Sequence, residues 1–137
     1  MPWLPLERPA FLGLVLLMLA GAAGVGAWYW RDSSQAEARA MTLTGGDPAR
    51  GRALLRPHGC TGCHSIPGVR GANGRAGPAL QGFAGRLYIG GVAENSAANL
   101  IRWLEDPPSL APHTAMPRTG LSPQEARDVA ALLYTLR

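Results

Sequence analysis

The segment Cys60-Thr61-Gly62-Cys63-His64 contains both cysteines of the chain, separated by two residues and followed at once by a histidine. C-x-x-C-H is the attachment signature of c-type haem. Two thioether bonds would fix the edge of the porphyrin at a short turn, and the adjacent imidazole would lie under the ring and bind iron. The motif therefore predicts one covalent haem c, with Cys60 and Cys63 as attachment sites and His64 as a metal ligand.

Other uses of the cysteine pair fit the sequence less well. A thioredoxin-type redox centre needs a strand–helix–strand context, which the sequence does not indicate. A disulfide across two residues would be strained. A zinc site has four candidate ligands, His58, Cys60, Cys63 and His64. Zinc sites usually draw on two well-separated ligand pairs, whereas these four fall within seven positions. Haem attachment is favoured, with zinc and redox chemistry as the alternatives.

A low-spin electron-transfer haem usually has a second axial ligand, and Met116 is the leading candidate. It follows a proline-rich stretch, residues 107–117, which predicts an extended strap that can press a thioether onto iron. His113 is the main rival and His58 a weaker one. A His–Met pair raises the reduction potential relative to a His–His pair. The other methionines lie outside the predicted domain: Met1, Met18 and Met41.

The N-terminal third contains a run long enough to cross a membrane. From Ala10 to Trp30 there are 21 residues without a charge, close to the roughly 20 that a spanning helix needs. Aromatic residues at 28–30 are typical of an interfacial belt. A cleaved secretory signal with a small-residue site at 25–27 is the alternative, but the run exceeds a usual signal core. We predict a cytoplasmic leader at 1–9, a transmembrane anchor at 10–30, a linker at 31–44 and a domain at 45–137.

Composition narrows the class of domain. All 13 basic residues are arginine, and the net charge is +4. This balance fits an acidic partner or anionic lipid, and no arginine cluster interleaved with aromatics indicates nucleic-acid binding. The 18 glycines and 12 prolines predict short helices and long turns and argue against a doubly wound sheet.

Three helices are predicted in the domain. Asp47 and Pro48 open the first, which should stop near Arg56 because Pro57 disfavours helix in the residue before it. The second covers about 97–105, capped by Asn95 or Ser96. The last begins at the capping box Ser122-Pro123-Gln124-Glu125 and continues with apolar residues at helical spacing. No stretch predicts a strand, so the domain is expected to be all-α.

This arrangement resembles a class I cytochrome c domain, in which three to five short helices surround a covalent haem, over about residues 45–137. Residues 86–91, 95–107 and 115–117 are similar to the cytochrome c domain attached to subunit II of caa3-type oxidases. The chain resembles a free-standing, membrane-anchored version of that domain, without its copper-binding part.

The resemblance implies roles for further residues. Cys60 and Cys63 would form the thioethers, with His64 the proximal and Met116 the distal ligand. The Pro78 carbonyl would accept a hydrogen bond from the far ring nitrogen of His64. The positions that match propionate donors are Arg86, Tyr88 and Trp103. Gly51 resembles the small residue where the first and last helices cross, with Leu133 or Tyr134 opposite.

The function implied is single-electron transfer and not catalysis, because two axial ligands leave no vacancy for a small-molecule substrate. In the family, haem c is attached outside the cytoplasm, which puts the domain on the periplasmic side of a bacterial inner membrane. A basic rim would steer it to an acidic partner. We expect a carrier or subunit serving a respiratory complex, with a terminal oxidase as the leading partner. The alternatives are a cytochrome subunit of a periplasmic dehydrogenase, and a haem sensor or peroxidase-like enzyme.

Overall fold

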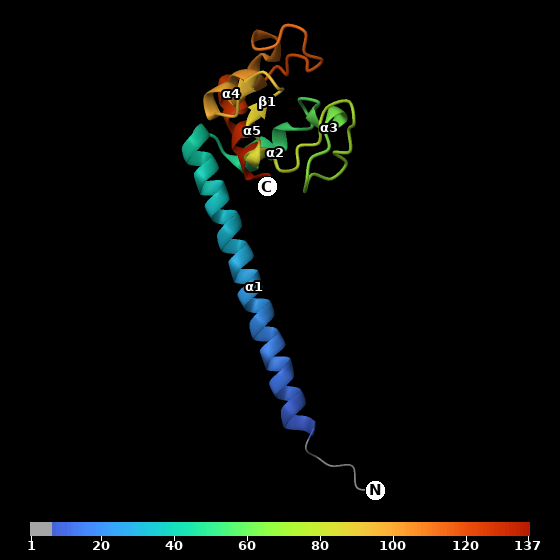
Figure 1. The fold of residues 1–137 in the computed structure, drawn as a ribbon, viewed down its shortest axis with the longest axis vertical. Coiled ribbons are helices and arrows are strands. Elements are labelled where there is room, and N and C mark those ends of the chain that lie inside the picture. The colour runs from blue at the N-terminus through green and yellow to red at the C-terminus, as the bar shows by residue number, and fades with distance from the viewer. Residues whose placement is uncertain (1–6) are drawn as a thin grey trace. The chain divides into compact units, whose positions relative to one another are not determined.

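The computed structural model of the chain describes residues 7–137 (Figure 1). Most of the predicted leader, residues 1–6, lies outside the described residues. By their contacts the residues form two units, Met1–Gln35 and Ala36–Arg137.

Helix α1 (Glu7–Thr44) contains the apolar run. It is long and apolar enough to cross a membrane, with a mean hydropathy of 2.2 in its most apolar window. Large apolar side chains such as Phe11, Leu17 and Trp30 are exposed, whereas the core helix of a soluble protein would bury them. A signal sequence near the N-terminus satisfies the same criteria of length and composition, so the helix is either an anchor or a signal.

The segment predicted as a linker, residues 31–44, is helical and continues α1. It contains strong helix formers, including three alanines, and it has no glycine or proline before Gly45. The hydroxyls of Ser33 and Ser34 donate to backbone carbonyls one turn earlier, so they do not interrupt the helix. Gly45, with a φ of 68°, then ends it.

The elements of the second unit are short: α2 (Pro48–Leu54), α3 (Cys60–Cys63), the 3-10 helix η1 (Phe83–Gly85), β1 (Tyr88–Ile89), β2 (Ala93–Glu94), α4 (Ala97–Glu105), the 3-10 helix η2 (Pro107–Ser109) and α5 (Pro123–Thr135). The three predicted helices are present as α2, α4 and α5. Asp47 accepts the backbone N–H groups of residues 49 and 50, Ser96 caps α4, and Ser122 forms a capping box with Glu125. Local capping chemistry therefore determines where each helix begins.

Helix α5 is the centre of the core and packs against α2 and α4. Its residues Ala126, Val129, Leu132 and Leu133 are buried, which confirms the apolar stripe seen in the sequence. The 3-10 helix η2 lies within the stretch predicted as an extended strap, so only the part after residue 109 is irregular.

The crossing of α2 and α5 depends on Gly51. A Cβ at this position would lie 2.1 Å from the carbonyl oxygen of Asp128 and 3.0 Å from the nitrogen of Val129. The predicted role of Gly51 at a helix crossing is therefore correct, but the opposing residues are not the predicted Leu133 and Tyr134, which lie more than one turn further along α5.

A two-stranded antiparallel ribbon, which the sequence did not predict, pairs Tyr88 with Glu94 and Ile89 with Ala93. Each strand has only two residues, too few to show an alternating pattern. Gly90 and Gly91 form the turn, both with positive φ, the conformation that glycine adopts at no steric penalty. The fold remains mostly helical.

The buried carboxylate of Asp128 links α5 to the start of α2. It is 3% exposed and accepts hydrogen bonds from Arg50 Nε at 2.9 Å and from the backbone N–H of Asp47 at 2.8 Å. Gln124 Nε2 donates from the preceding turn at 3.1 Å. The hydrogen bond from the Arg50 guanidinium is the main reason why the pKa of Asp128 is lowered, against the opposing effect of burial.

This depressed pKa predicts a loss of stability in acid. The contribution of Asp128 is complete above its unfolded pKa of about 3.9 and is lost as the pH falls through its lower folded pKa. Asp128→Asn should lower the free energy of unfolding at pH 7 by about 1–2 kcal/mol, because Arg50 is largely exposed and the ion pair is screened. Urea unfolding at pH 7 and pH 3 measures both effects.

Hydrogen bonds within its capping box also lower the pKa of Glu125, which therefore contributes in the same acid range. The difference between the wild type and Asp128→Asn isolates the part due to Asp128. An equal stability loss for the variant at pH 7 and pH 3 would contradict the assignment.

Candidate haem site

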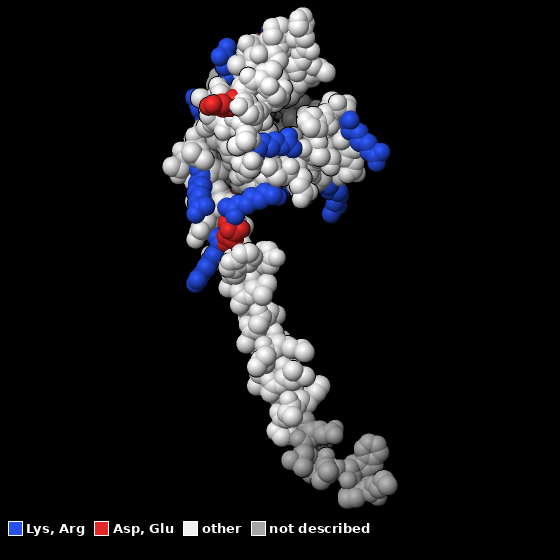
Figure 2. Space-filling view, in the orientation of Figure 1, with Lys and Arg blue, Asp and Glu red and all other residues white. Residues whose placement is uncertain are grey.

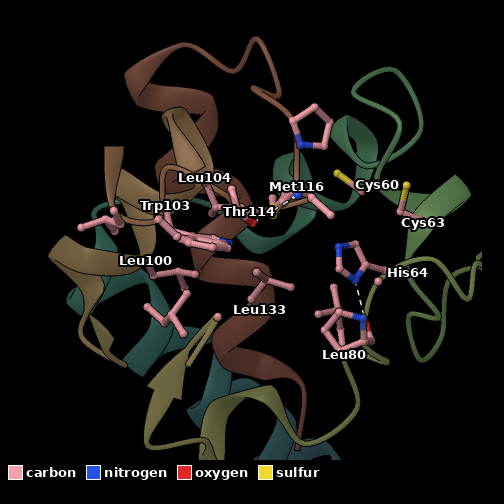
Figure 3. Close-up of a pocket in the computed structure, with 18 of the residues that line it drawn as sticks. Cys60, Cys63, His64, Leu80, Leu100, Trp103, Leu104, Thr114, Met116 and Leu133 are labelled. Atoms are coloured by element: carbon pink, nitrogen blue, oxygen red, sulfur yellow. Dashed lines mark hydrogen bonds between the residues drawn. The ribbon is translucent and has the colours of Figure 1, made fainter. Parts of the chain in front are cut away.

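The second unit contains a cavity of about 680 Å³ between the Cys60–His64 segment and the helices α4 and α5. Figure 3 shows Cys60, Cys63 and His64 on one side of it, and Leu100, Trp103 and Leu104 on the other. Cofactor pockets usually have volumes of about 300–1,000 Å³ and mainly apolar linings. The cavity therefore has the size and lining of a site for a large, flat, apolar cofactor.

The two cysteines are presented on a single turn of helix, α3, which begins after Gly59. Gly59 has a φ of 74° and turns the chain into α3. Cys60 is partly buried and Cys63 is exposed, and the two do not form a disulfide. Burial raises the pKa of the Cys60 thiol. Pro57 breaks the helix before the motif, as expected, because α2 ends at Leu54.

His64 has one ring nitrogen held by the chain. Its Nδ1 lies 2.7 Å from the carbonyl oxygen of Pro78, and because a carbonyl only accepts, Nδ1 carries the proton and donates. In the neutral ring, this contact selects the tautomer whose Nε2 carries the lone pair that can bind a metal. Gly77 leaves room for the ring, since a Cβ there would lie 2.4 Å from His64 Cε1.

The three candidates for the second axial ligand occupy different places. Met116 and His113 both line the cavity, Met116 partly buried and His113 exposed. His58 is not among the lining residues. Its Nδ1 lies 2.9 Å from the carbonyl oxygen of Thr119 and its Nε2 4.0 Å from Glu125 Oε1. Met116 also packs against the apolar core.

The structure does not support the zinc alternative. Within residues 7–137, no group of three or more His, Cys, Asp or Glu side chains is arranged to hold a metal ion. His58, one of the four candidate ligands, makes its hydrogen bond to the segment around residue 119.

Comparison with known proteins decides the family. The family model described as Cytochrome c matches residues 48–137, which include the cysteine pair and the cavity. The chain belongs to the cytochrome c family. It is also similar to cytochrome c oxidase subunit 2 of Bacillus sp. (strain PS3), with 39% identity over 62 residues. This match covers 44% of the chain and 17% of the relative, so the chain spans about a sixth of that protein's length. No solved structure matches the chain.

The cytochrome is thus an electron carrier with covalent haem c at Cys60 and Cys63. Its own residues fit this group: two free thiols and one singly hydrogen-bonded imidazole adjoin an apolar cavity of suitable size. The tight approach of Gly77 to the imidazole is consistent with a ring held in one orientation.

Two of the three candidate propionate donors lie at the cavity. Trp103 and Arg86 line it, whereas Tyr88 does not and is 58% exposed. Figure 3 shows the nitrogen of the Trp103 indole on the cavity side. Gly90 is adapted to this ring, because a Cβ there would lie 2.6 Å from Trp103 Cη2. Arg86 donates to the carbonyls of Ala79 and Gln81 and lies over the ring of Phe83.

The residue that supports the segment around Arg86, at the wall of the cavity, was not predicted from the sequence. Asn95, considered as a helix cap, instead donates from Nδ2 to the carbonyl of Arg86 at 2.9 Å and accepts at Oδ1 from the Tyr134 hydroxyl at 3.0 Å. It thereby ties the segment before the ribbon to α5. No local signal distinguishes this role from a cap, because both use a short polar side chain before a helix. The role of Gly77 beside the His64 ring had a local signal, because Gly77 directly precedes Pro78, whose carbonyl was expected to contact that ring.

Charge is distributed unevenly over the cytochrome. Between Asp47 and Glu94 the chain has no acidic residue. The arginines in this part are Arg50, Arg52, Arg56, Arg70, Arg75 and Arg86. Figure 2 shows several arginines and few acidic side chains on the visible face of the second unit. The attachment segment therefore lies in the basic part of the chain, in line with the expectation of a partner with acidic surface groups.

Proposed function

We propose that this cytochrome is tethered to a bacterial inner membrane and passes single electrons in a respiratory chain, to or within a terminal oxidase complex. One observation carries the proposal: His64 and Met116 both line the cavity next to the cysteine pair. Two protein ligands would leave no position for a substrate, which favours transfer of electrons over catalysis.

The residues of the chain have separate tasks in this function. Pro78 holds the His64 ring in the tautomer whose Nε2 can bind iron. Met116 would supply the sulfur that raises the reduction potential. Trp103 and Arg86 would donate to the propionates. When bound, the haem supplies reversible one-electron chemistry at iron, and the protein supplies ligands, orientation and an apolar surround.

Removing Met116 should open the iron to an external ligand. The reduced wild type is expected not to bind carbon monoxide, and reduced Met116→Ala is expected to bind it readily. Visible spectra during a titration with carbon monoxide measure this. Met41→Ala is a matched control, because Met41 is exposed on α1 and does not line the cavity.

His113→Ala tests the rival ligand in the same titration. If His113→Ala opened the iron and Met116→Ala did not, the distal ligand would be His113. A wild type that binds carbon monoxide as readily as Met116→Ala would overturn the assignment of an electron carrier with two protein ligands and favour a sensor or peroxidase-like enzyme.

Two observations support an oxidase as partner. The chain is similar to an oxidase subunit, and the residues around the cysteine pair, between Asp47 and Glu94, include arginines and no acidic residue. The apolar part of α1 would be the anchor, with the domain on the periplasmic side. Extraction in mild detergent and identification of the chains that stay bound test this. Oxidase subunits are expected; a periplasmic dehydrogenase in their place would establish the alternative function.

A further inference from the structure

Met116 lies in the segment between η2 and α5. From here on, the strap means residues 110–121 of this segment. The part of the strap around Met116 has only hydrogen bonds between residues close in the sequence. The N–H of Thr114 donates to the carbonyl of Ala111 at 3.0 Å, and that of Met116 donates to Thr114 Oγ1 at 3.2 Å. Within the described chain, residues 112–117 make no backbone hydrogen bond to another element. The position of Met116 is therefore set by the ends of the strap and by side-chain packing.

Thr119, three residues after Met116, is held from two sides. Its Oγ1 donates to the carbonyl of Leu104 at 2.6 Å, in the last turn of α4. Its own carbonyl accepts from His58 Nδ1 at 2.9 Å. His58 lies two residues before Cys60, so this contact joins the strap to the segment that carries the first thioether sulfur.

Arg118, the residue before Thr119, also contacts the end of α4. Its Nε lies 3.0 Å from Asp106 Oδ1 and its Nη2 3.3 Å from Oδ2, a two-point contact at the end of α4. Asp106 Oδ1 is buried and accepts no hydrogen bond from the described residues. The contact of Arg118 Nε with Asp106 Oδ1 is therefore an ion pair without a hydrogen bond, whereas Nη2 donates a hydrogen bond to Oδ2. We call the contacts of Arg118 and Thr119 the strap clamp.

The clamp is close enough to Met116 in the sequence to restrict the position of its backbone. Only Pro117 and Arg118 separate Met116 from Thr119, and each residue extends the chain by at most about 3.5 Å. Pro117 has a nearly fixed φ, which removes one of the few rotations in between. Fixing residues 118 and 119 to α4 and to the attachment segment thus restricts Met116 to a small region of the cavity.

We propose that the strap clamp positions the Met116 thioether for iron, so that Arg118 and Thr119 are positioning residues for the electron carrier. This inference rests on the proposed role of Met116 as a ligand. A thioether is a weak neutral ligand, and its binding depends on being held at the iron without entropic loss. Loosening the clamp should let a competing ligand displace Met116 while the rest of the domain stays folded.

Thr119→Val tests the clamp, because it keeps the shape of the side chain and removes the hydroxyl. The ferric holoprotein is titrated with imidazole, and the reduction potential is measured. We expect the apparent affinity for imidazole to rise about fivefold, the effect of one lost hydrogen bond, and the reduction potential to fall as thioether ligation weakens. Thr119→Ser should restore both values. Arg118→Gln should act in the same direction and gives a second test if Thr119→Val does not fold.

Thr135→Val is the matched control for a merely structural effect. Thr135 Oγ1 also donates to a helix carbonyl, that of Leu132 at 2.7 Å, but it lies at the end of α5 and does not line the cavity. Urea unfolding of both valine variants measures their stability. If imidazole affinity changes equally in Thr135→Val and Thr119→Val, or in neither, the clamp does not position Met116 and the inference is overturned.

The Met116→Ala variant distinguishes a wrong assignment of the strap clamp from a wrong assignment of Met116 as a ligand, on which the proposed function depends. If the wild type already binds imidazole as tightly as Met116→Ala, Met116 is not a ligand and the proposed function itself fails. If Met116→Ala binds imidazole far more tightly than the wild type while Thr119→Val and Arg118→Gln match the wild type, Met116 is a ligand and only the clamp is refuted.

Discussion

Replacing Cys60 and Cys63 together by alanine is expected to leave the haem-free domain unfolded at neutral pH. The cavity of about 680 Å³ would then have no covalent occupant. At roughly 24 cal/mol for each Å³, a closed empty cavity of this size would cost about 16 kcal/mol, and this is an upper limit because the cavity is partly open to solvent. The whole stability of a typical domain is only about 5–15 kcal/mol. Helices α4 and α5, which form one wall of the cavity, therefore cannot stay packed around an empty space.

Far-ultraviolet circular dichroism of the haem-free variant measures the loss of helix. Thr61→Ala is the control, because it changes the same turn, keeps both sulfurs and does not line the cavity. A haem-free double variant that retains native helical content and unfolds cooperatively would show that the cavity collapses at low cost, and that the cofactor is not part of the core.

Gly51→Ala is expected to lower the free energy of unfolding of the haem-loaded protein by about 3 kcal/mol. The new Cβ would lie 2.1 Å from the carbonyl oxygen of Asp128 and 2.6 Å from its carbonyl carbon. Both are backbone atoms, so no side-chain rotation relieves the clash and α2 must move away from α5. Inside a helix, alanine is intrinsically more favourable than glycine by about 1 kcal/mol. A net loss of stability in Gly51→Ala can therefore come only from the clash where α2 crosses α5.

Urea unfolding of Gly51→Ala beside Gly85→Ala measures this effect. A Cβ at Gly85 would meet no atom within 4 Å, and its φ is not in the left-handed region, so the control should stay near the stability of the wild type. If Gly51→Ala were as stable as the wild type, the close approach of α2 and α5 would not be a requirement of the fold.

The local elements were predictable because their signals lie within a few residues. Asp47, Ser96 and Ser122 each cap a helix through contacts with residues two or three positions away. The small polar side chains of residues 31–44 indicated a linker, and they did not show that its backbone is helical. Serine and threonine hydroxyls can bond to their own helix, and composition does not show whether they will.

Contacts between distant parts of the chain were not predictable. Asp128 bonds the backbone of a residue 81 positions away, and Tyr134 bonds Asn95 across 39 positions. Neither pair has a motif, because their meeting depends on how the helices cross. The residues opposite Gly51 were misplaced for the same reason.

The amino-acid order alone determined which atoms bear the chemistry: two sulfurs and an imidazole within five residues, and a thioether after a proline-rich stretch. Only the folded chain decided which groups face one another across the cavity and which contacts hold the residues that follow Met116. The physical reason is the separation along the chain over which each interaction acts. Covalent spacing and helix caps act over a few residues, whereas packing and buried hydrogen bonds join residues that only the crossing of helices brings together.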